Sequence, residues 1–298
     1  MNLTVEERAM LEGKEGVATR KAMEIITALG EIYGAKRLLP VTSVQVSGVS
    51  YDNLGEAGLK FLAEMAEGGA RARVLTTLNP AGMDIENWQE LGISEEFAQN
   101  QKRVLDAFSR MNIIPTATCT PYLVGNLPHF GEQIAWAESS AVCFANSVLG
   151  ARTNREGGPS ALAASLTGKT AAYGYHLEDQ RQPTFKVHVN LDIEGSSDFG
   201  ILGKVIGEKS CLLKGNLVPI IEGIQSATLE NLKSFCASLA TYGGIALFHM
   251  IGITPEADNI EMPEDGFSIN VDDFNEGHAS LTDTSETEID FVLSLIHI

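Results

Sequence analysis

Short apolar runs alternate with segments of helical periodicity along this chain, and no other feature of the sequence constrains the fold as strongly. In the first half we expect strands at 38–46, 72–78 and 113–118, and helices at 16–33, 56–67, 94–111 and 130–149. Thr4 and Glu7 have the spacing of a capping box, which predicts a short helix before them all. The alternation favours parallel strands joined by right-handed crossovers and covered by helices. The sequence therefore predicts an α/β fold with parallel or mixed sheets and at least two α/β layers.

A second series of the same kind begins at residue 185. It predicts strands at 185–193, 217–221 and 245–250 and helices at 197–207 and 229–242, with a further strand beginning at Ile289. The turn-rich stretch 178–184 separates the two series. We therefore expect an N-terminal α/β domain at 1–183, which carries most of the functional site, and a second α/β domain at 184–292.

The charge balance excludes several classes of partner. Lys and Arg total 21 against 39 for Asp and Glu, a formal net charge of -18. A field of this sign repels phosphate backbones and anionic membrane surfaces, so neither nucleic acid nor a membrane is expected as a partner. The N-terminus has no secretory signal pattern, and no apolar run approaches the roughly 20 residues that span a bilayer. We expect a cytoplasmic protein with reduced cysteines.

Polar, turn-forming residues follow each of the first three predicted strands. The strands run into Ser47-Gly-Val-Ser50, Asn79-Pro-Ala-Gly82 and Cys119-Thr-Pro-Tyr122. Ligands of doubly wound sheets bind beyond the carboxyl ends of the strands, so these three turns predict one pocket. Taken singly, a Ser or Asn in such a place is most often a turn former or a helix cap, and a lone Cys is most often a buried apolar residue.

Two further features lie along the expected helix 130–149 and just beyond it. Glu138 and the two serines that follow it would sit inside an apolar helix, which indicates a site or a polar network. Arg152 and Arg155 could together clamp an oxyanion, or they could satisfy the carbonyl groups at the helix end. We interpret the remaining cysteines as core residues, namely Cys143, Cys211 and Cys236. Four histidines lack metal-ligand spacing, and we expect no metal site at them: His129, His176, His188 and His249.

One continuous stretch carries a resemblance to a known family. It runs from Cys119-Thr-Pro-Tyr through Trp136-Ala-Glu-Ser-Ser to Arg152-Thr-Asn-Arg-Glu-Gly-Gly158. The turns that contain Gly48 and Asn79 support it. On these motifs the chain resembles the aconitase X family over residues 1–292, and the resemblance implies an aconitase-like fold.

The resemblance also implies an iron-sulfur hydro-lyase. In that family three cysteines hold the cluster, expected to be 4Fe-4S, and one iron stays open as a Lewis acid. Cys119 matches one of these metal ligands. A separate small subunit supplies the serine that acts as general base, so no catalytic residue is expected in this chain. The family's substrate-binding positions fall on Gly48, Val49, Ser50, Asn79, Pro80, Glu138 and Ser139.

Three functions stay open at this point. The first is dehydration of (R)-5-phosphomevalonate to trans-anhydromevalonate 5-phosphate in the mevalonate pathway of isoprenoid biosynthesis. The alternative within the family is dehydration of cis-3-hydroxy-L-proline. An alternative of another class is a non-catalytic metabolite-binding protein that keeps the aconitase-like scaffold.

The resemblance ends before the C-terminus. Where the family continues into a Gly-Cys-Pro-His motif with a second cluster cysteine, this chain reads Leu293-Ser-Leu-Ile-His-Ile298. These residues resemble the translation of a transposon-end sequencing adapter, so we interpret 293–298 as a non-native tail. Two cluster ligands and a substrate-contacting lysine would then be missing, and we expect this chain alone to be inactive.

Overall fold

Residues 1–260 and 267–274 are described by a computed structural model, and their strands form three sheets. The strands are β1 Leu38–Pro40, β2 Ser43–Val46, β3 Leu75–Leu78, β4 Ala135–Trp136, β5 Lys169–Ala171, β6 Phe185–Val189, β7 Pro219–Glu222, β8 His249–Met250 and β9 Ser268–Val271. One sheet has the order β3-β2-β4 and another the order β8-β7-β6-β9, and all pairs in both are parallel. Only the small β1-β5 sheet is antiparallel in the described part. The predicted α/β class is confirmed.

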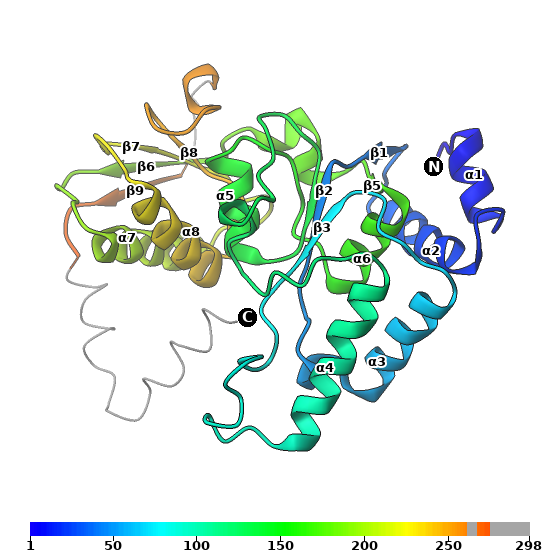
Figure 1. Ribbon diagram of the computed structural model, residues 1–298. Coiled ribbons are helices and arrows are strands. Elements are labelled where there is room, and N and C mark those ends of the chain that lie inside the picture. Colours follow the sequence, from blue (N-terminus) through cyan, green and yellow to red (C-terminus); the bar gives the residue numbers. More distant parts are fainter. Residues whose placement is uncertain (261–266, 275–298) are drawn as a thin grey trace.

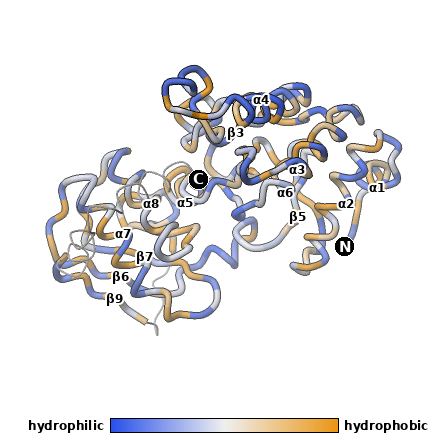
Figure 2. The backbone as a smooth tube through the Cα atoms, turned by 90° about the horizontal axis from the view of Figure 1, so that it is seen from below, coloured by the Kyte–Doolittle hydropathy of each residue, from blue (hydrophilic) through white to orange (hydrophobic). Residues whose placement is uncertain are grey.

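Helices pack against both parallel sheets. They are α1 Val5–Leu11, α2 Val17–Ile32, α3 Tyr51–Glu67, α4 Glu95–Arg110, α5 Ser139–Ser147, α6 Gly158–Thr167, α7 Ser196–Ser210 and α8 Leu229–Gly243. In Figure 1, α7 and α8 lie side by side below the four-stranded sheet, and α6 packs between α2 and β2. Hydrophobic and hydrophilic residues alternate along α4 in Figure 2, as expected of a helix with one buried face.

The buried apolar residues form two clusters, and β4 lies where these clusters meet. The first cluster joins α2, α3, α4 and α6 to β2 and β3, whereas the second surrounds the four-stranded sheet. Successive strand residues face opposite ways, and accordingly Ala135 belongs to the first cluster and Trp136 to the second. Phe144 of α5 also belongs to the second cluster. Packing therefore crosses the predicted domain boundary at 183–184, which itself stays a prediction.

Two of the predicted strands were wrong in detail. Residues 38–46 form β1 and β2 in different sheets, since Val41 N–H bonds to the Gly168 carbonyl and Thr42 N–H to that of Gln133, drawing the chain from one sheet to the other. Residues 113–118 form no strand and make one isolated bridge, through Ile114. Pro115 has no N–H to continue a ladder there.

The long helix predicted at 130–149 was also wrong, because it is β4 followed by α5. Glu138 has extended backbone angles and its carboxylate accepts the N–H groups of the first turn, so α5 begins only after it. The apolar residues before Glu138 pair with β2 instead of continuing a helix. The sequence interpretation also missed α6 and β5.

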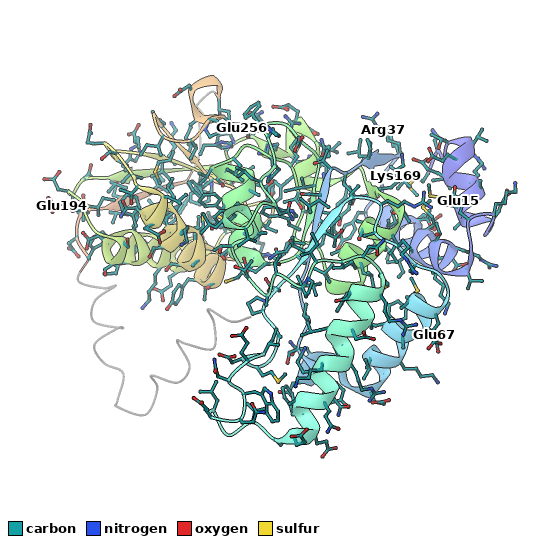
Figure 3. All side chains as sticks on the ribbon, viewed as in Figure 1. Glu15, Arg37, Glu67, Lys169, Glu194 and Glu256 are labelled. Atoms are coloured by element: carbon teal, nitrogen blue, oxygen red, sulfur yellow. The ribbon has the colours of Figure 1, made fainter. Side chains whose placement is uncertain are left out.

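The elements predicted between residues 185 and 250 are all present, with shifted ends. The strand expected at Ile289 and the tail 293–298 lie outside the described residues. In the ranges that are described, no helix combines the length and apolarity needed to cross a membrane. Figure 3 shows Glu67 and Glu194 pointing outward from the ribbon, in line with their exposure.

Candidate functional site

A cavity of about 1450 Å³ lies beyond the carboxyl ends of β2, β3 and β4. The residue after each strand end lines it, namely Ser47, Asn79 and Ala137. The structure therefore brings together the turns that the strand pattern predicted. All eight residues predicted for substrate and metal line this one cavity: Gly48, Val49, Ser50, Asn79, Pro80, Cys119, Glu138 and Ser139. Their individual roles stay predictions.

The turn after β2 is shaped by a glycine backbone angle, a helix cap and one close approach. Gly48 has a φ of +74°, which favours glycine, and Ser50 caps α3 by accepting from Asp52 N–H at 3.3 Å. A Cβ at Gly158 would lie 2.8 Å from the Ser47 carbonyl oxygen, so the start of α6 packs directly on this turn. The turn is thereby held between two helix N-termini.

The loop that carries Cys119 is fastened at both of its ends. Thr118 N–H bonds to the Leu78 carbonyl at 3.2 Å, so this segment runs beside β3 although it is no strand. Further along, the Asn126 amide donates to the Val44 carbonyl at 3.1 Å and to Thr77 Oγ1 at 3.0 Å. Cys119 is half-buried between these anchors.

Burial raises the pKa of the Cys119 thiol, and the nearby Glu138 carboxylate raises it further. The protonated thiol is therefore favoured until a cation arrives to replace the proton. A thiolate becomes a good metal ligand only once that proton has left.

Glu138 serves as the N-cap of α5 rather than as an interior helix residue. One carboxylate oxygen accepts from Ser140 N–H at 3.1 Å, and the other accepts from Ser140 Oγ at 2.7 Å and from Ala141 N–H at 2.5 Å. Burial raises the pKa of Glu138, and these hydrogen bonds together with Arg155 oppose the rise. Ser139, next to it, is the first residue of α5.

Gln45 joins three walls of the cavity from beneath. It is fully buried. Its Nε2 donates to Asn79 Oδ1 at 3.0 Å and to the Thr118 carbonyl oxygen at 3.2 Å, and its Oε1 accepts from Glu138 N–H at 3.3 Å. The sequence interpretation placed Gln45 in a buried strand and gave it no role. An amide in such a strand must find partners, and that requirement was the available signal.

Gln101 of α4 braces the remaining walls in the same way. This side chain is also fully buried. Its Nε2 donates to the Val49 carbonyl oxygen at 3.0 Å, while its Oε1 accepts from Tyr51 N–H at 2.9 Å and from Gly82 N–H at 3.3 Å. The turns after β2 and β3 are thus tied to one helix through a single amide.

The structure separates the two arginines that were considered as a clamp. Arg152 hydrogen-bonds to Glu178, and it does not line the cavity. Arg155 does line it and donates to the Gly244 carbonyl at 3.1 Å. Among the described residues around the cavity, Arg155 is the only lysine or arginine. A joint clamp by both arginines is therefore excluded in this arrangement.

Within the described ranges, the other cysteines and the histidines contribute nothing to the cavity lining. Cys143 and Cys236 are buried as predicted, but Cys211 is exposed at the end of α7, so its assignment to the core was wrong. Over residues 1–260 and 267–274, no cluster of three or more His, Cys, Asp or Glu is arranged to hold a metal. Cys119 is the one thiol that the described chain presents to the cavity.

Comparisons with known proteins agree on one family. Residues 1–179 match the model of the aconitase X first domain, and residues 183–279 match that of the aconitase X second domain. The phosphomevalonate dehydratase large subunit of Methanothermobacter thermautotrophicus is 47% identical over 282 residues, which are 94% of this chain and 69% of that protein. The cis-3-hydroxy-L-proline dehydratase of Pseudomonas aeruginosa is 35% identical over 96% of this chain and 50% of its own length.

A solved structure extends the likeness to three dimensions. The crystal structure of Thermococcus kodakaraensis aconitase X in its holo-form superposes with a TM-score of 0.87 and 45% sequence identity. The match covers 97% of this chain and 72% of that one. The relatives are therefore longer than the sequence described here.

Proposed function

Because the chain belongs to the aconitase X family, we propose that it is the large subunit of a cytoplasmic hydro-lyase that dehydrates (R)-5-phosphomevalonate to trans-anhydromevalonate 5-phosphate. The observation that carries this proposal is the identity of 47% to a phosphomevalonate dehydratase large subunit, over nearly the whole chain. The partner would be the small subunit of the same enzyme, in a heterodimer. The general base would come from that subunit.

The cavity supports the proposal through its size and its donors. A volume of about 1450 Å³ accommodates a small phosphorylated hydroxy acid with room for a partner's side chains. The backbone at Gly48, the Ser50 hydroxyl and the Asn79 amide lie on its walls and can bind carboxylate, hydroxyl or phosphate oxygens. Arg155 adds a cation that suits an anionic substrate.

The cofactor would be an iron-sulfur cluster, most simply 4Fe-4S, with Cys119 as one ligand. The half-buried thiol on the cavity wall fits that role. Such a cluster, when bound, supplies a Lewis acid for the departing hydroxyl group. The residues of this chain would hold and orient the substrate beside it, and Glu138, whose pKa is raised by burial, lines the same cavity.

The test is a parallel assay of two substrates. The full-length large subunit is co-expressed with its small subunit, reconstituted with iron and sulfide without oxygen, and given each substrate separately. We expect loss of water from (R)-5-phosphomevalonate and not from cis-3-hydroxy-L-proline. Activity on the hydroxyproline alone would favour the second candidate, a cis-3-hydroxy-L-proline dehydratase, which is supported by the relative that is 35% identical. Binding without turnover of either substrate, with iron present, would indicate a non-catalytic metabolite-binding protein and contradict the proposal.

A further inference from the structure

The orientation of the Gln45 amide is fixed by two backbone groups whose roles cannot be exchanged. Glu138 N–H can only donate, so the atom 3.3 Å away from it must be the Gln45 oxygen. The Thr118 carbonyl can only accept, so the atom 3.2 Å away must be the Gln45 nitrogen. If the Gln45 amide were turned over, its NH2 group would face the Glu138 N–H and its oxygen would face the Thr118 carbonyl. Both contacts would be unfavourable because Gln45 is fully buried.

This orientation dictates that of the neighbouring Asn79 amide. Gln45 Nε2 donates to Asn79 at 3.0 Å, so the Asn79 atom that faces Gln45 is Oδ1 and its Nδ2 faces away. Asn79 Nδ2 has no hydrogen-bond partner within the described chain. It is nevertheless absent from the buried partnerless atoms there, which are Asn126 Oδ1 and His176 Nε2. Asn79 Nδ2 therefore reaches solvent, and Asn79 is a cavity-lining residue.

We propose that Gln45 is a positioning residue that makes Asn79 present an N–H donor, and not a carbonyl oxygen, to the substrate. The group that it selects is an oxygen acceptor, such as a carboxylate or phosphate oxygen of the hydroxy acid. Asn79 adds no charge to the cavity, and its amide is held by Gln45, which is not among the cavity-lining residues. This inference rests on the proposed function for the identity of the substrate.

The change Gln45→Glu tests the proposal because it removes the donor to Asn79, and it also leaves the Thr118 carbonyl without its donor and buries a charge. A carboxylate at this position accepts from Asn79 Nδ2, so the Asn79 amide turns over and presents Oδ1 to the cavity. In the assembled enzyme we expect the dissociation constant of (R)-5-phosphomevalonate to rise about tenfold to a hundredfold, the size of a lost hydrogen bond to a charged group. In an Asn79→Ala background the same change should raise the dissociation constant by less than about threefold, because residue 79 no longer has an amide that Gln45 could orient.

A second variant keeps the test decisive if Gln45→Glu does not fold. In Asn79→Asp, Gln45 can still donate to one carboxylate oxygen, and the other replaces the N–H that faces the substrate. Asn87→Asp places the same charge at a more exposed position of the cavity lining and serves as the control for added charge. We expect Asn79→Asp to weaken binding at least tenfold more than Asn87→Asp.

Neutron diffraction of the wild-type complex of the large and small subunits shows the orientation of the Asn79 amide directly and needs no substrate. Deuterons on the cavity side of Asn79 would support the inference, whereas an oxygen there would overturn it. Equal losses from Gln45→Glu with and without Asn79 would also overturn it. If the wild-type enzyme does not bind (R)-5-phosphomevalonate, the proposed function fails, but the neutron result still decides the orientation.

Discussion

Arg181 and Glu256 form a buried ion pair, in which Arg181 Nε lies 3.1 and 3.0 Å from the two carboxylate oxygens. The rest of the guanidinium donates to the Asn146 carbonyl at 2.9 Å and to the Tyr175 carbonyl at 3.2 Å. Asn146 belongs to α5, whose first turn lies at the cavity. Figure 3 labels Glu256, which follows β8 in the second half of the chain. The pair therefore ties the two halves together behind the candidate site.

Loss of this pair should be costly. We expect Arg181→Met to lower the free energy of unfolding by about 3–5 kcal/mol, because it leaves a buried carboxylate without a partner. Urea unfolding followed by circular dichroism measures the change. Arg20→Met, which breaks the exposed Arg20–Glu24 pair, is the control and should have little effect. Equal effects of the two substitutions would mean that the buried pair does not hold the halves together.

Stability should also fall in mild acid because His249 is buried and neutral. Burial lowers its pKa to about 4, from about 6.5 in the unfolded chain, and its Nε2 donates to the Arg181 carbonyl at 2.8 Å. Well above pH 6.5, His249 is neutral in both the folded and the unfolded chain. As the pH falls toward 4, the unfolded chain takes up the proton first, so His249 alone should cost about 2 kcal/mol by pH 5.

His249→Gln isolates this contribution, since glutamine keeps a donor but does not titrate. Urea midpoints of the two proteins at pH 7 and pH 5 give the comparison. We expect the loss between these pH values to be smaller in the variant by about 2 kcal/mol. An unchanged loss would show that other groups control the acid response.

Cys119 should be required for cluster assembly if it is a metal ligand. We expect Cys119→Ala to lose most of the iron and the visible absorption of the reconstituted heterodimer, because a missing thiolate leaves the cluster one ligand short. Cys211→Ala, at an exposed thiol far along the chain, is the matched control and should load normally. A full cluster in Cys119→Ala would remove this residue from the ligand set.

Gln101 should contribute to stability through its three hydrogen bonds. Gln101→Glu retains an acceptor but leaves the Val49 carbonyl without its donor and buries a charge. We expect a loss of about 2–3 kcal/mol in the free energy of unfolding, together with weaker substrate binding as the turns after β2 and β3 loosen. The control is Gln99→Glu on the exposed face of α4, which should change stability little. Similar results for both variants would argue against a bracing role.

Local signals in the sequence determined much of this protein. The capping box of Thr4 and Glu7 and the amphipathic periods of α2 and α4 involve residues within a few positions of one another, and all are present in the structure. The alternation of strands and helices predicted parallel pairing, which places strand ends at a shared edge. The turns after β2 and β3 could therefore be recognised as parts of one site before any coordinates were known.

Tertiary structure decided what fastens those turns together. Gln45 bonds to partners 34, 73 and 93 residues away, and no local pattern specifies such contacts. The two-residue strand β4 is too short to have a period of its own, so only pairing with β2 shows that a helix begins after Glu138. The sequence encodes short-range propensities strongly, but the partner of a buried amide is chosen by which chain segments the packed core brings within hydrogen-bonding distance.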